Sequence, residues 1–196
     1  NVWRIDYEAT TDKPTPINMT QHVYFNFHGE AEGTILDHDL TLFADKMTPT
    51  DAGLIPTGEI ASVKGTPFDF TTPHKIGERI REENEQLKFG KGYDHNFVLT
   101  APSQNGEPVK AAELYEETSG RYLEVWTTEP GIQIYSGNYL GPHIKGKSGV
   151  PYSENGGLAM ETQHYPDSPN KPQFPSTIVR PGETYRTVTE YRFGVK

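Results

Sequence analysis

Short segments in which apolar and charged residues alternate are the feature that most constrains the fold. Near the N-terminus, Trp3, Ile5 and Tyr7 alternate with charged residues. Side chains of a β-strand point to opposite faces with a period of two, so this pattern predicts a half-buried strand. Similar segments recur between turns that use much of the chain's 19 Gly and 16 Pro. The sequence therefore predicts an all-β protein with many short strands.

The expected elements follow one another without a repeat or an internal linker. With 196 residues, the chain is long enough for one domain with a hydrophobic core. We expect residues 1–196 to form a single antiparallel β-sandwich domain. Strands are predicted at 1–9, 17–26, 38–44, 59–63, 96–100, 109–115, 121–128, 131–140, 158–163, 176–180 and 184–193. We predict a hairpin from 109–128 and another from 176–193, loops at 45–58 and 90–95, and a helical turn or two within 74–88.

A carboxylate lies inside one of the predicted strands, in the stretch from Gly156 to Asn170. Leu158 and Met160 fall on one face of this strand, whereas Glu161 and its neighbours at i ± 2 fall on the other. Glu is depleted in strands. An isolated strand Glu typically lies on a solvated sheet face, so periodicity alone does not make Glu161 functional.

A second candidate is His22, in the predicted strand 17–26. Its face of the strand also carries Asn18, Thr20 and Tyr24, which suits a groove for a polar ligand. The near-neutral reference pKa of histidine suits acid–base chemistry. A plain solvated face would explain the pattern almost as well.

Charge and composition exclude several classes of function. The net charge is −9 without a Lys/Arg cluster, so neither nucleic acid nor an anionic membrane is an expected partner. No apolar run approaches the ~20 residues of a membrane span, and the absence of Cys excludes disulfides and thiolate catalysis. The chain begins at Asn1 inside a patterned strand, which indicates that residues precede it. We expect a cytoplasmic protein, with a periplasmic or secreted location left open.

Two further motifs have simpler interpretations. Residues 141–148 match the phosphate-loop pattern G-x-x-x-x-G-K-S, but Gly149-Val150-Pro151 follows instead of the helix that the pattern requires. We interpret this match as chance. The run Asp37-His38-Asp39 could ligate a metal, but adjacent strand positions point to opposite faces, so we interpret it as the end of a loop. We predict neither a metal nor a cofactor.

An ordered series of segments, taken together, resembles the aldose 1-epimerases, the galactose mutarotase family. The resemblance extends from Asn1 to Phe193 and implies a large antiparallel β-sandwich of the galactose mutarotase type, lacking its N-terminal part, with a sugar site on a concave sheet face. The matching segments are 15–26, 55–60, 65–70, 92–97, 127–138, 161–163, 174–175 and 180–183.

The resemblance also implies roles for individual residues. Glu161 matches the catalytic base and His22 the catalytic acid of the family, which act on opposite sides of the sugar ring. Asp94 and Gln133 match positions that contact the sugar. Phe68, Tyr135 and Tyr165 are aromatic candidates to face the ring.

This chain departs from the family pattern in two ways. Gln21 and Val23 flank His22, where the family usually has Asn and a small hydroxyl residue. Family members are also much longer at the N-terminus, where an Arg and a second His contact sugar hydroxyls. The missing N-terminal part of the same protein is therefore a candidate partner, and the oligomeric state is left open.

The activity that the resemblance implies is interconversion of the α and β anomers of a free hexose, such as galactose or glucose. Three alternatives remain. One is a carbohydrate-binding β-sandwich module without catalysis. Another is an epimerase-like protein for a phosphorylated hexose, which would need basic residues near the matching motifs. The third is a glycosidase that uses Glu161 with Asp94.

Overall fold

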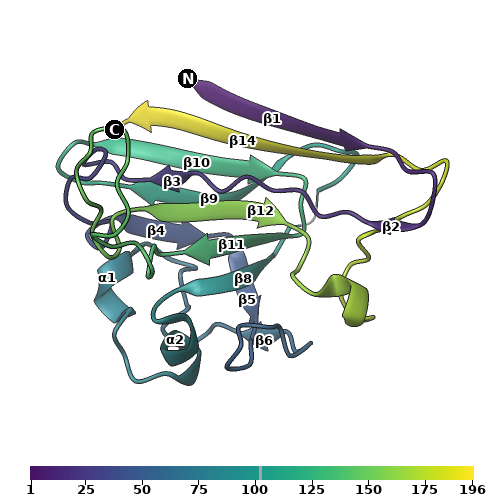
Figure 1. Ribbon diagram of the computed structural model, residues 1–196, viewed down its shortest axis with the longest axis horizontal. Helices are drawn as coiled ribbons and strands as arrows, with labels where there is room; N and C mark the ends of the chain where they lie inside the picture. The colour runs from purple at the N-terminus through teal and green to yellow at the C-terminus, as the bar shows by residue number, and fades with distance from the viewer. Residues whose placement is uncertain (102) are drawn as a thin grey trace.

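The computed structural model describes residues 1–101 and 103–196, and within them two six-stranded antiparallel sheets share one core (Figure 1). The first sheet comprises, in spatial order, β1 (Val2–Ala9), β14 (Tyr185–Val195), β10 (Arg121–Thr127), β9 (Val109–Tyr115), β4 (Asp39–Leu42) and β7 (His74–Lys75). The second comprises β3 (Tyr24–Phe25), β12 (Leu158–Gln163), β11 (Gly131–Tyr135), β8 (Asp94–Leu99), β5 (Ala44–Thr48) and β6 (Ala61–Ser62). A separate pair joins β13 (Ile178–Val179) to β2 (Thr15–Pro16).

Helical structure is short and lies mainly between β7 and β8. The segments are α1 (Ile76–Arg79), α2 (Glu85–Gly90) and the 3-10 turn η1 (Ser168–Asn170). At the start of α2 the Asn84 side chain accepts a hydrogen bond from the backbone of Gln86, and Lys91 ends the helix in a left-handed conformation. The helical turns predicted within 74–88 are thus confirmed. Among the described residues, no helix is both long and apolar enough to cross a membrane.

The core lies between the two sheets and confirms the predicted alternation in β12. Leu158 and Met160 are fully buried in it, beside Ile134 of β11. Burial of such a side chain stabilises a fold by about 1.5–3 kcal/mol. All six residues of β12 are buried, and Glu161 on its other face is only 9% exposed. Periodicity alone favoured a solvent-exposed Glu161, and that expectation is therefore wrong.

The continuous strand predicted at 17–26 is also wrong, because only the short strands β2 and β3 pair near its ends. Between them, the backbone N–H of Met19 donates to the Tyr185 hydroxyl and that of Val23 donates to Oε1 of Gln21. Side-chain oxygens therefore replace the carbonyl partners that a strand ladder would supply.

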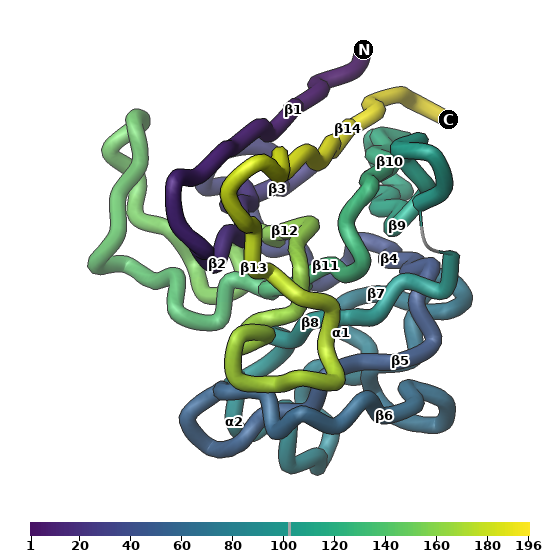
Figure 2. Tube along the Cα trace, turned by 90° about the vertical axis from the view of Figure 1, so that its right-hand side faces the viewer, coloured from purple at the N-terminus to yellow at the C-terminus, as the bar shows by residue number. Residues whose placement is uncertain are grey.

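The hairpin predicted from 176 to 193 is a second correction. Its two strands separate, since β13 pairs with β2 whereas β14 lies between β1 and β10 in the first sheet (Figure 2). The hairpin predicted from 109 to 128 is confirmed as β9 and β10. Two predicted loops are shorter than expected, because β5 begins at Ala44 and β8 begins at Asp94.

Candidate active site

The register of the second sheet brings the predicted polar residues onto one face. Across β12, β11 and β8, Glu161 pairs with Gln133, and Gln133 pairs with Asn96. The next row runs from Tyr135 of β11 to Asp94 of β8. Because side chains alternate along each strand, residues two apart share a face. The sheet thus places Glu161, Gln133 and Asp94 side by side, although they are far apart in the sequence.

Hydrogen bonds join these side chains into a network. Nε2 of Gln133 donates to Oδ1 of Asp94 at 2.8 Å. Nε2 of Gln163 lies 3.4 Å from both Oε1 of Gln133 and Oδ1 of Asn96. Each amide is therefore held in orientation by its neighbours, which preorganises this face for a polar ligand.

His22 reaches the same face from the irregular segment before β3. Its Nε2 lies 3.4 Å from Oε1 of Glu161, and its side chain is 49% exposed whereas that of Glu161 is 11% exposed. The imidazole lies beside two aromatic rings, with centroids 4.9 Å away for Tyr24 and 6.0 Å away for Tyr135. All four predicted site residues thus lie together, with His22 as the most accessible.

Burial makes ionisation of the two carboxyls costly. It raises the pKa of Glu161 above its usual value, an effect that His22 opposes and that nearby Asp94 reinforces. Burial also raises the pKa of Asp94, against a lowering by the Gln133 hydrogen bond and by His22. A carboxylate with a raised pKa is a stronger base than a solvated one, so the environment suits Glu161 to accept a proton.

The turn before β8 fixes the position of Asp94. Nδ2 of Asn138 donates to the carbonyls of Gly90 and Tyr93, at 2.9 Å each. Gly92 has a φ of 142°, and a Cβ there would lie 2.4 Å from Oδ1 of Asn138. Only glycine fits this close approach, which explains the Gly-Tyr-Asp segment predicted as part of the site.

Sequence reasoning missed Asn96, which is 2% exposed and whose Nδ2 lies 3.4 Å from Oγ1 of Thr48. It lies two positions after Asp94, so period-two spacing could have found it. Tyr24, which the sequence placed on the same face as His22, packs on the His22 ring. Of the three aromatic candidates, Tyr135 lies at the site, Phe68 belongs to the buried core and Tyr165 packs on Phe174.

Asp37 and His38 of the run 37–39 lie with His28 in a cluster whose ligating atoms are all within 4.8 Å of one another, but these atoms are already hydrogen-bonded. Asp37 lies between two imidazoles, 3.0 Å from Nε2 of His28 and 3.0 Å from Nδ1 of His38. Nε2 of buried His38 accepts the backbone N–H of Phe27, so the neutral ring carries its proton on Nδ1 and donates it to Asp37. Neither nitrogen of His38 has a free lone pair for a metal ion.

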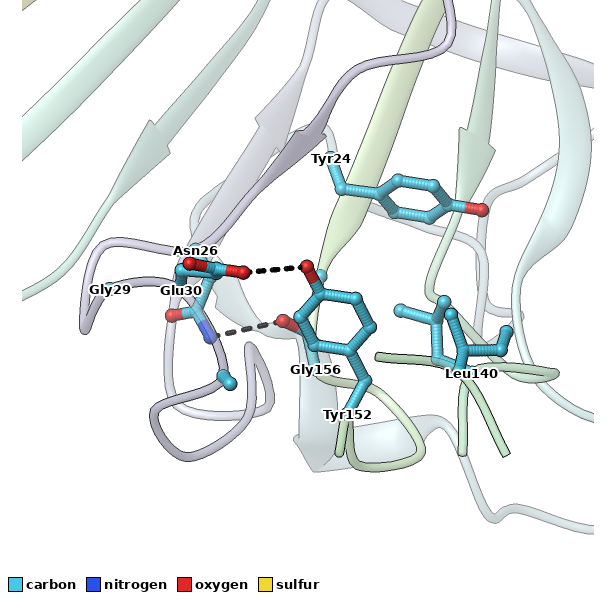
Figure 3. Close-up of a pocket in the computed structure, with 10 residues that line it drawn as sticks. Tyr24, Asn26, Gly29, Glu30, Leu140, Tyr152 and Gly156 are labelled. Carbon is cyan, nitrogen blue, oxygen red and sulfur yellow. Dashed lines mark hydrogen bonds between the residues drawn. The ribbon is translucent and has the colours of Figure 1, made fainter. Parts of the chain in front are cut away.

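The structure confirms the prediction that the helix required by the phosphate-loop pattern does not follow the match. Residues 136–157, all of which the structure describes, form turns and contain no helix. This loop instead contributes to a cavity of about 410 Å³ beside the sheet face (Figure 3). Tyr24 lines the cavity and also touches His22, but none of the four predicted site residues lines it. The polar chemistry therefore lies on the sheet face and not in this cavity.

A family model described as aldose 1-epimerase matches residues 1–192. The chain belongs to the aldose 1-epimerase family. It is 44% identical over 191 residues to galactose mutarotase of Mus musculus, a match that covers 97% of this chain and 54% of that protein. Aldose 1-epimerase of Escherichia coli K12 is also 44% identical over 191 residues, with 96% and 54% covered.

Solved structures of the aldose 1-epimerase family show the same fold. An aldose epimerase homologue from C. elegans superposes with a TM-score of 0.85 at 30% identity, over 100% of this chain and 56% of that one. Galactose 1-epimerase from Lactobacillus acidophilus gives a TM-score of 0.81 at 27% identity, over 100% and 54%. The predicted antiparallel fold of the galactose mutarotase type is confirmed. The chain spans about half the length of these relatives.

Proposed function

We propose that the whole protein to which this chain belongs interconverts the α and β anomers of a free hexose such as galactose or glucose. The observation that carries the proposal is the contact between a half-exposed imidazole and a buried carboxylate, His22 and Glu161, on a polar sheet face. Family membership supports the reaction class. The anomeric reaction needs one base and one acid, which this pair supplies.

The proposed reaction opens and recloses the hemiacetal. Glu161 takes the proton from the C1 hydroxyl, the bond between C1 and the ring oxygen breaks, and His22 gives a proton to that oxygen. The free aldehyde then turns about the C1–C2 bond. The ring closes on its other face with both proton transfers reversed, so neither group is consumed. Each positioned proton transfer can contribute ~10²–10⁴ in rate.

The spacing of the pair fits the two oxygens that exchange protons. The hydroxyl oxygen and the ring oxygen are bonded to the same carbon, so one base and one acid that lie near each other can reach both. The 3.4 Å between Glu161 and His22 is longer than a strong hydrogen bond. A bound sugar would replace this contact with one hydrogen bond to each residue.

Asp94 and Gln133 are proposed to bind the sugar hydroxyls. A carboxylate accepts hydrogen bonds from hydroxyls, and the amide of Gln133 both accepts and donates. Their mutual 2.8 Å hydrogen bond fixes both side chains before a sugar arrives. The resemblance implies further sugar contacts in the N-terminal part of the family, so the proposal concerns the whole protein.

Polarimetry on freshly dissolved α-glucose or α-galactose tests the proposal. The whole protein should accelerate the approach to anomeric equilibrium, and Glu161→Gln should abolish the acceleration while sugar binding, followed by calorimetry, persists. A wild-type rate in Glu161→Gln with intact binding would refute the assignment of the base. A wild-type protein that binds the sugar without accelerating the reaction would instead identify a carbohydrate-binding module.

A further inference from the structure

The pairing of β3 with β12 stops just before it would reach His22. Leu158 pairs with Phe25 and Ala159 pairs with Tyr24. Continued by one residue on each antiparallel strand at a time, the same register would next place Val23 opposite Met160 and His22 opposite Glu161. The strand β3 nevertheless ends at Phe25 and begins only at Tyr24. A side chain therefore separates the segment that carries His22 from β12, which carries Glu161.

The side-chain amide of Gln21 occupies the space between this segment and β12. Its Oε1 accepts the backbone N–H of Val23 at 2.7 Å. Its Nε2 donates to the backbone carbonyl of Met160 at 3.0 Å and to the hydroxyl of buried Tyr191. Tyr191 in turn donates to the carbonyl of Met160 at 2.8 Å. One amide thus bridges the backbone residue after His22 and the backbone residue before Glu161.

We propose that Gln21 is a positioning residue, whose amide sets the separation and orientation of His22 relative to Glu161. The proposal rests on the proposed function of that pair. The half-exposed imidazole packs beside two aromatic rings, whereas the amide ties the residue after it, Val23, to the carbonyl of Met160 in β12. Gln21 stands where the resemblance leads one to expect Asn, whose amide is carried on a side chain one methylene shorter.

Gln21→Leu tests the proposal, because leucine keeps a similar volume and removes every hydrogen bond of the amide. In the whole protein, kcat for anomer interconversion should fall about 10- to 100-fold with little change in KM, since a small misplacement of a reacting group costs rate without removing sugar contacts. Gln86→Leu is the matched control. The Gln86 amide likewise bridges a backbone N–H and a carbonyl, both of Thr50, away from the site, and its loss should leave kcat unchanged.

A second measurement does not depend on turnover. Carbon-13 NMR of the Glu161 carboxyl should show its titration midpoint moving upward in Gln21→Leu and not in Gln86→Leu, because a displaced His22 opposes the effect of burial less. Tyr191→Phe, which removes only one partner of the amide, should change both readouts in the same direction and by less. An unchanged Glu161 titration in a folded Gln21→Leu would overturn the proposal. If the wild-type protein has no anomerase activity, the proposed function fails and the titration alone decides the role of Gln21.

Discussion

Within the part of the chain that the structure describes, two histidines contact a buried glutamate, and the two pairs differ in how completely the carboxylate is hydrogen-bonded. In the first, His22 lies 3.4 Å from Glu161. In the second, Nδ1 of His164 lies 2.6 Å from Oε2 of Glu129, whose side chain is 1% exposed. The other oxygen of Glu129 accepts the Tyr185 hydroxyl at 2.8 Å. Both oxygens of Glu129 therefore have close partners.

The Glu161 carboxylate has no such set of partners. Within residues 1–101 and 103–196, no hydrogen bond to it meets ordinary geometry, and the imidazole at 3.4 Å is its one ionic contact. A buried carboxylate without donors is costly, so proteins retain one where a ligand completes it. The same two residue types thus form a structural pair where both carboxylate oxygens are hydrogen-bonded, and a candidate catalytic pair where they are not.

The largest expected difference between the two pairs is in turnover. His22→Ala should lower kcat for anomer interconversion about 10²–10⁴-fold, because it removes one of the two proton-transfer groups. His164→Ala should leave kcat per folded molecule unchanged. Polarimetry on both variants, with the folded fraction measured by circular dichroism, checks this. Equal losses in the two variants would contradict the distinction between the pairs.

Stability should show the reverse order. His164→Ala removes the imidazole that contacts Oε2 of the buried Glu129, so the free energy of unfolding should fall by about 3 kcal/mol. His22→Ala should change it by less than about 0.5 kcal/mol, since its side chain is half exposed. Urea titrations of the two variants measure both values. A large loss for His22→Ala would show that this pair is structural after all.

Much of the fold could be predicted from local pattern, and the site could be predicted only in part. Alternation placed Leu158 and Met160 in the core and Glu161 on the opposite face, as observed. It could not show that this opposite face is also buried, because that depends on the segment around His22 and on Gln133 and Asn96 in neighbouring strands. Register across strands is a long-range property that a single strand does not encode.

The segment before β3 shows a different limit. Its residues alternate as a strand would, but the hydrogen bonds of Met19 and Val23 go to the side chains of Tyr185 and Gln21. Such side-chain acceptors compete with a strand ladder and leave the alternation intact. The role suggested for His22 came from the resemblance, whereas the means by which it is held required the structure.

Sugar binding offers a smaller effect that sharpens the comparison. Asp94→Ala should raise KM about 10- to 100-fold and change kcat less, because a hydrogen bond to a charged group contributes about 1.5–3 kcal/mol. Steady-state kinetics over a range of galactose concentrations separates the two parameters. Glu129→Gln, in the structural pair with His164, should leave KM unchanged. A collapse of kcat at unchanged KM for Asp94→Ala would assign Asp94 to the chemistry instead.

The smallest expected effect concerns the loss of stability caused by burying an ionised Glu161 without hydrogen-bond donors. Its pKa in the folded protein is raised, chiefly by burial, so the folded state binds this proton more tightly than the unfolded chain does. Stability therefore falls as pH rises from the usual carboxyl value of 4.5 through the raised pKa. Glu161→Gln removes this penalty and should increase the free energy of unfolding at pH 7 by about 0.5–2 kcal/mol. In urea titrations from pH 4 to pH 8, the gain should vanish toward the acidic end. Glu129→Gln should lower the free energy of unfolding at pH 7, because it replaces a carboxylate that has two close hydrogen-bond partners. A gain in stability in that variant would mean that the two carboxylates do not differ in the way their hydrogen bonds indicate.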